Sequence, residues 1–205
     1  MSPFSAFARP CRALMARLRR DDQGVAAVEF AMIVPIMFFL FVGAVEFSQA
    51  LTVDRRVTQS ASSTADLVAR ADVFNNTGEV DNILKIIEQL IAPYDLNPLT
   101  VSVISVQAKL KPGNPKVTEM RVSWSRNNKG QTPYTANSIY DHIPTGLLAS
   151  GESVIVGEAK YAYVPLLFNY FITTAFDMEE RFYLKPRQKA CVSLKPTNCV
   201  TGNPF

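Results

Sequence analysis

One glycine and one glutamate near the N-terminus carry the chemistry that the sequence supports most clearly. Gly24 precedes Val25, and Glu29 and Phe30 stand at the fifth and sixth positions after the glycine. If the chain is cut after Gly24, the new α-amino group of Val25 lies about one helical turn from the Glu29 carboxylate. That carboxylate can then pair with the amine of its own chain or of a neighbouring chain. In the alternative interpretation, Glu29 lies at headgroup depth on an uncut anchor.

Residue types that catalyse reactions are sparse in the rest of the sequence. His142 is the only histidine, and it follows Asp141 in a segment rich in turn residues. The sequence has no G-x-S-x-G nucleophile elbow, no phosphate-binding P-loop and no H-E-x-x-H zinc motif. We therefore expect no enzymatic activity, cofactor or metal. The rival hypothesis is a membrane-anchored hydrolase that uses Asp141 and His142.

The cysteines favour a structural bridge near the C-terminus. Cys11 lies in the basic N-terminal segment and is lost if the chain is cut after Gly24. Cys191 and Cys199 then remain as an even pair, too widely spaced for a C-x-x-C redox motif. A disulfide between them fits an oxidising compartment, with two free thiols as the alternative.

The residues around Glu29 form an apolar stretch long enough to cross a bilayer. Glu29 is the only charged residue from position 25 to position 45, and a helix of that length spans roughly 31 Å. A secretory signal has a shorter apolar core, followed by a small-residue cleavage site. The positive-inside rule keeps the segment before this stretch in the cytoplasm and translocates the residues after it, because the earlier segment carries Arg9, Arg12, Arg17, Arg19 and Arg20.

Apolar residues keep a helical spacing beyond the membrane. They recur every three or four positions from Val53 to Val68, which predicts one helix that continues to about Ala71. Pro35 lies inside the apolar stretch and removes one helical hydrogen bond, so we expect a kink or partial unwinding near Ala31 to Pro35. The predicted divisions of the chain are a cytoplasmic leader (1–24), a transmembrane helix (25–47), a helix extension (48–74) and a head (75–205).

The head has the patterns of an α+β fold with a small, mainly antiparallel sheet. We predict a helix over 79–91 and strands over 99–110, 118–124, 153–163 and 178–185. In the first strand the apolar positions change phase, which predicts a bulge or bend near Val103. In the second strand Thr118, Met120, Val122 and Trp124 alternate with polar residues and are expected on one face.

Two further segments connect these strands. Residues 127–151 are rich in Asn, Gly, Thr and Pro and predict a loop with short helical pieces around Tyr140 and Leu147. Residues 165–176 are apolar but too short to span a bilayer as a helix. We expect a buried crossover there, and a patch that faces the membrane or another subunit is the alternative.

The N-terminal residues resemble a known family. The string from Arg19 to Pro35, with Gly24, Glu29 and Phe30 in place, is similar to the TadE-like proteins of the tight-adherence (Flp) pilus system. The same three residues look like the processing pattern of type IV prepilins. The resemblance covers residues 17–60 and is weaker in the strand that ends at Tyr163.

This resemblance implies a structural role in a bacterial envelope. It implies a minor pilin or pseudopilin of Flp-type pili, cut after Gly24 by a prepilin peptidase, in which Glu29 and Phe30 serve recognition or assembly. The implied location is the inner membrane, with a single span and a periplasmic head. Implied partners are the peptidase, other Flp-type pilins, TadE-, TadF- and TadG-like subunits, the assembly platform and membrane lipid. The alternative is a single-pass periplasmic binding or envelope protein without a pilus role.

The charge balance points to no nucleic-acid partner. The formal net charge is only +3, and much of the basic excess lies in the leader. Charged residues beyond the membrane are interspersed, as on a solvated face.

Overall fold

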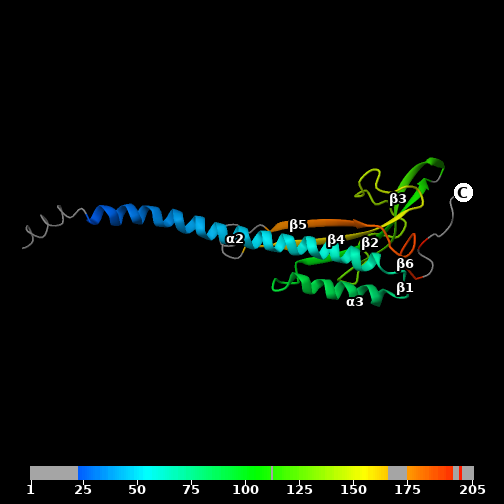
Figure 1. The fold of residues 1–205 in the computed structure, drawn as a ribbon, viewed down its shortest axis with the longest axis horizontal. Coiled ribbons are helices and arrows are strands. Elements are labelled where there is room, and N and C mark those ends of the chain that lie inside the picture. The colour runs from blue at the N-terminus through cyan, green and yellow to red at the C-terminus, as the bar shows by residue number, and fades with distance from the viewer. Residues whose placement is uncertain (1–22, 112, 166–174, 196–198, 200–205) are drawn as a thin grey trace, which may run out of the picture. The chain divides into compact units, whose positions relative to one another are not determined.

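The computed structural model describes residues 23–111, 113–165, 175–195 and 199 (Figure 1). The chain divides into two compact units between Phe47 and Ser48. We call residues 23–47 the apolar segment and the unit Ser48–Phe205 the head.

One long helix belongs to both units. Helix α2 spans Gln23–Ala69 and contains Pro35. The predicted helix to about Ala71 is therefore confirmed. Its part within the head buries Val53, Val57 and Val68, and these side chains belong to the main core cluster. The recurring apolar stripe thus packs on the rest of the head, as the spacing predicts.

The head contains the predicted antiparallel sheet. Its strand order is β3-β2-β4-β5, and all three pairings are antiparallel, which confirms the α+β fold. Strands β3 and β5 form the two edges of this sheet. The strands are β2 (Leu99–Lys111), β3 (Asn114–Asn127), β4 (Ser153–Tyr163) and β5 (Phe176–Leu184).

A second helix comes after the first, beyond a short break. Helix α3 spans Thr77–Glu88 and continues as the 3₁₀ turn η2, Gln89–Ile91, close to the predicted range. Asn76 caps α3, because its side-chain oxygen accepts a hydrogen bond from the Glu79 backbone N–H at 3.1 Å. The sequence did not predict the parallel pair of β1 (Val73–Phe74) and β6 (Ser193–Leu194), each only two residues long.

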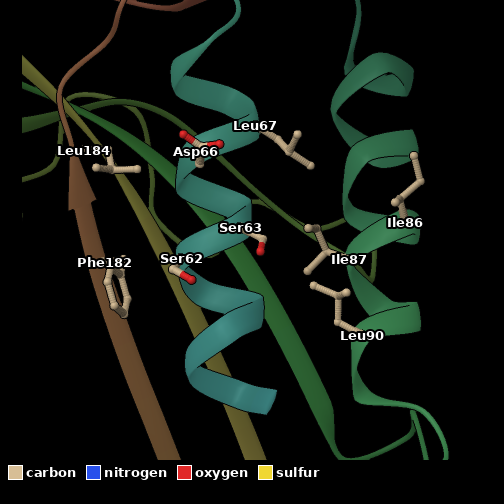
Figure 2. A pocket seen from close by; sticks show the side chains of 9 residues that line it. All are labelled: Ser62, Ser63, Asp66, Leu67, Ile86, Ile87, Leu90, Phe182 and Leu184. Atoms are coloured by element: carbon tan, nitrogen blue, oxygen red, sulfur yellow. The ribbon is translucent and has the colours of Figure 1, made fainter. Parts of the chain in front are cut away.

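Helices α2 and α3 lie side by side, with β5 on the other side of α2 (Figure 2). Gly157 of β4 allows α2 to approach the sheet closely. A Cβ atom on Gly157 would lie 2.1 Å from the Ala61 carbonyl oxygen and 2.8 Å from the Ala65 nitrogen. A side chain at this position would therefore push the helix away from the strand.

A loop covers the opposite face of the sheet. There Ile104, Val106 and Val156 form a second core cluster with Tyr140 and Leu148, which come from the segment between β3 and β4. The central strand β2 is thus buried on both faces, with Val101 and Val103 in the helix-side cluster.

This two-sided burial corrects the predicted bulge near Val103. Strand β2 pairs with β4 without any shift from Leu99 to Gln107. The change of phase arises because β2 places apolar residues first toward the helices and then toward the loop. The irregularity lies in the pairing with β3, between Ser105 and Val106, where Ser123 is the additional residue.

The bulge at Ser123 also corrects the predicted face of Trp124. Trp124 belongs to the helix-side cluster, whereas Val122 belongs to the loop-side cluster. An additional residue in a strand reverses the alternation of its side chains, so the two residues point to opposite faces.

The predicted helical pieces around Tyr140 and Leu147 are wrong. The segment between β3 and β4 contains turns and one isolated bridge, between Arg121 and Ile139. Of the predicted crossover at 165–176, residues 166–174 lie outside the described part of the chain.

Candidate processing and assembly site

Gly24 and Val25 occupy the first turn of α2. A Cβ atom on Gly24 would have no atom outside its immediate neighbours within 4 Å, and the Val25 side chain is exposed.

Glu29 and Phe30 lie about one turn further along and are both exposed. Side chains on a helix point back toward its N-terminus, and residues four apart share a face. The Glu29 carboxylate is therefore directed toward the position that the Val25 amine would take after a cut. Phe30 projects from a neighbouring part of the helix surface and is available to a second helix.

The rest of the apolar segment presents a continuous apolar surface. Its large apolar side chains from Val25 to Phe41 are 40–70% exposed. Within the described residues, α2 is the one helix long and apolar enough to cross a membrane. A patch of this size is not stable in water, so lipid or other helices must cover it.

Residues 24–66 match the family of TadE-like proteins. The match begins at Gly24 and ends three residues before the helix does, so it confirms the resemblance of the N-terminal residues. Searches among curated proteins and solved structures gave no match.

The match covers only residues 24–66 of the 205, so it shows what this segment is similar to. The apolar part of α2 fits a single membrane span by length and composition. The matched residues contain Gly24, Val25, Glu29, Phe30 and Pro35, but most of the head lies outside them.

A disulfide lies near the C-terminal end of the described residues. Cys191 and Cys199 are bridged, with 6.1 Å between their Cα atoms. The adjacent Val192 carbonyl accepts a hydrogen bond from the Trp124 indole N–H at 2.8 Å. Trp124 also packs edge-to-face against Phe74, so Val192, β3 and β1 share one buried contact.

Asp141 and His142 lie in the loop that covers the sheet. Both are exposed, and the His142 ring packs edge-to-face against Tyr140 with centroids 5.4 Å apart. In the described part of the chain no hydrogen bond or ion pair joins the two side chains. No group of three metal-ligating side chains was found among the same residues.

A buried carboxylate lies beneath this loop, and the sequence patterns did not reveal it. Glu158 is 2% exposed, and it accepts hydrogen bonds from Arg181 Nε at 3.0 Å and from the Tyr134 hydroxyl at 3.3 Å. Burial, and then the Glu158 charge, raise the pKa of Tyr134, so this tyrosine stays protonated near neutral pH. The cluster therefore holds the loop on β4 and β5. The ion pair between Glu158 and Arg181 can be expected only when the strand register, which places these two residues opposite each other, is known.

A hollow of about 560 Å³ lies on the helix side of the head (Figure 2). Ser62 and Ser63 of α2 line it, together with Ile86 of α3 and Phe182 of β5. Its one carboxylate, Asp66, already pairs with Arg70 and Arg187. The hollow is therefore mainly apolar and carries no unpaired charge among its lining residues.

Proposed function

We propose that this protein is a minor pilin or pseudopilin of Flp-type pili, cut after Gly24 by a prepilin peptidase. The single observation that supports this most strongly is the exposed carboxylate of Glu29 on an exposed apolar helix, one turn after Gly24 and inside the TadE-like match. The head is then periplasmic and the leader cytoplasmic, as the arginines before Gly24 imply.

Placing the Glu29 charge in a membrane costs free energy, and the proposed cut offsets part of this cost. A charged side chain costs about 2.5–3.5 kcal/mol at the centre of a membrane helix, and Glu29, about 6 Å from the start of the span, costs less than this. Cleavage creates a positive amine about 6 Å along the helix from Glu29, and an ion pair in a low dielectric is much stronger than in water. The pair can form within one chain or between neighbours, and the second case sets the register between subunits.

Assembly then requires the apolar segment to exchange its contacts with lipid for contacts with the helices of other subunits. Before assembly, lipid covers the side chains from Val25 to Phe41. Leaving the bilayer requires the helices of other pilins to provide equivalent burial. The chain is larger than a Flp-type major pilin, so we assign it an accessory position rather than the bulk of the fibre.

The proposed cut is tested by N-terminal sequencing of the membrane-bound protein from cells that make Flp-type pili. We expect the mature chain to begin at Val25. A chain that begins at Met1, or at any residue other than Val25, contradicts the proposal and favours a single-pass envelope protein without a pilus role.

The role of Glu29 is tested by Glu29→Gln, which removes the charge but keeps the shape. We expect the head to fold normally, while incorporation into pili or the number of pili falls severalfold. Asp54→Asn is the matched control, because it removes a carboxylate from α2 outside the apolar stretch. Equal pilus production by wild type and Glu29→Gln, or an equal loss in Asp54→Asn, argues against charge pairing at Glu29.

A further inference from the structure

A second hollow, of about 890 Å³, lies at the end of the head where α2 enters it. Its walls include Tyr94, Tyr161 and Tyr163, with Val164 and Pro98 beside them and Gln49 contributed by α2. The polar side chains of Asp95 and Asn97 also line it and are exposed to water. We call this the entry-end hollow. Gln49 stands two residues after Phe47, where the apolar segment ends.

The sheet register brings exposed apolar side chains to this same end. Tyr163 pairs with Phe176, so the end of β4 and the start of β5 meet there. Leu99 pairs with Tyr161, and the Leu99 N–H donates to the Leu96 carbonyl at 3.1 Å. Around the hollow, Leu96 is 40% exposed, Val164 41% and Phe176 52%.

The segment that carries Leu96 is held firmly on α2. The Arg56 guanidinium donates to the Leu90 carbonyl at 2.9 Å and also to the Ala92 carbonyl. The same guanidinium lies over the Tyr94 ring, 5.9 Å from its centroid. Tyr94 and the backbone that leads to Leu96 are therefore held in place against α2.

Chain continuity places this end close to the bilayer. Gln49 lies only about 3 Å along a helix from Phe47. Each headgroup layer extends roughly 5–7 Å beyond the hydrocarbon core. A wall of the hollow that includes Gln49 is thus within headgroup depth wherever the apolar segment spans the membrane.

We propose that the entry end of the head docks on the lipid surface, with the exposed side chains of Leu96, Val164 and Phe176 inserted among the headgroups. Tyrosine is enriched at membrane interfaces because its ring is apolar and its hydroxyl is polar, which fits the three tyrosines of the hollow. The proposal rests on the membrane anchorage within the proposed function. It adds a second attachment, which the head must release before the subunit leaves the bilayer.

The test uses the full chain in vesicles of phosphatidylethanolamine and phosphatidylglycerol. A Cys11→Ser background leaves one thiol for a nitroxide label, introduced by Val164→Cys, by Leu96→Cys or by the control Val117→Cys. Val117 matches Val164 in type and exposure, 42% against 41%. It lies next to Thr118, the partner of Leu110, some 11 residues along β2 from Leu99 and therefore about 36 Å from the entry end.

Accessibility of each label to dissolved oxygen and to a water-soluble nickel chelate is measured by power saturation. Because oxygen concentrates in lipid, we expect the oxygen-to-nickel ratio at positions 164 and 96 to exceed that at position 117 severalfold. Val164→Asp should lower the ratio at position 96, whereas Val117→Asp should leave it unchanged. Trp124 fluorescence verifies that each variant is folded.

Two results overturn the proposal. A ratio at position 164 equal to that at position 117 means that the entry end faces water. Low accessibility to both reagents at position 164 means that protein, such as a second copy of the chain, covers it. Neither result bears on the cut after Gly24 or on the Glu29 charge, so failure of lipid docking is distinguishable from failure of the proposed function.

Discussion

Gly157→Ala should loosen the contact between α2 and the sheet. The new Cβ atom would lie 2.1 Å from the Ala61 carbonyl oxygen, whereas an ordinary contact needs about 3.5 Å. The helix must therefore retreat by roughly 1.4 Å. No rotamer change relieves the overlap, because the nearest atoms are the Ala61 oxygen and the Ala65 nitrogen, which both belong to the backbone.

The expected cost depends on the contacts that the retreat disturbs. Val53, Val57, Ala61 and Val68 of α2 are fully buried in the core that it shares with the sheet. Overpacking costs typically 1–3 kcal/mol, and here it also opens the contacts of a whole helix. We expect a loss of about 3 kcal/mol or more in the free energy of unfolding, a large part of the 5–15 kcal/mol that is usual for a domain.

The assay is urea unfolding of the full chain in detergent, monitored through Trp124, the only tryptophan, which is 3% exposed. Gly43→Ala is the control, because a Cβ atom there meets nothing within 4 Å. Adding Ala65→Gly to Gly157→Ala should not restore stability, since backbone atoms remain in the way. A loss below about 0.5 kcal/mol, the usual range of surface substitutions, or full rescue by Ala65→Gly, would refute this reasoning.

Two further substitutions test polar groups in the head. Arg126 binds both carboxylate oxygens of Asp81 at 2.7 Å, and this hydrogen bonding holds the pKa of Asp81 below its usual 3.8. Asp81→Asn should cost about 1 kcal/mol at neutral pH. Because the folded-state pKa is depressed, that difference should stay constant above about pH 5 and shrink as the pH falls below 3.8 toward the folded-state pKa, so the urea midpoints of the two proteins should lie closer together at pH 3 than at pH 5 or 7. Tyr140→Phe removes a buried hydroxyl that has no hydrogen-bond partner among the described residues, so the variant should be as stable as wild type or more stable by about 1 kcal/mol; a lower thermal midpoint would reveal a partner for this hydroxyl.

The sequence predicts those parts of the structure whose patterns are local. The helical stripe from Val53 to Val68 and the strand that ends at Tyr163 are local patterns, and both elements are found where expected. The apolar stretch with Glu29 is likewise recognisable from neighbouring residues alone, and the family match covers it.

The errors come from features that depend on distant partners. A strand buried on both faces, like β2, gives the same change of phase as a bulged strand, and only its pairing with β4 separates the two cases. Nothing in the residues next to Ser123 indicates that it is the additional residue of the bulge. The entry-end hollow combines residues from α2, the segment after η2 and the end of β4, so no stretch of sequence contains its pattern.

Strand β5 bears on how copies of this protein can meet. It forms an edge of the sheet, and it carries Asp177, Glu179, Glu180 and Arg181 among its nine residues. Unpaired strand edges invite ribbon-like growth from molecule to molecule, and charged side chains discourage it. Where many copies of the chain lie close together, the charges on β5 therefore disfavour pairing of this strand with the edge strand of a neighbouring copy.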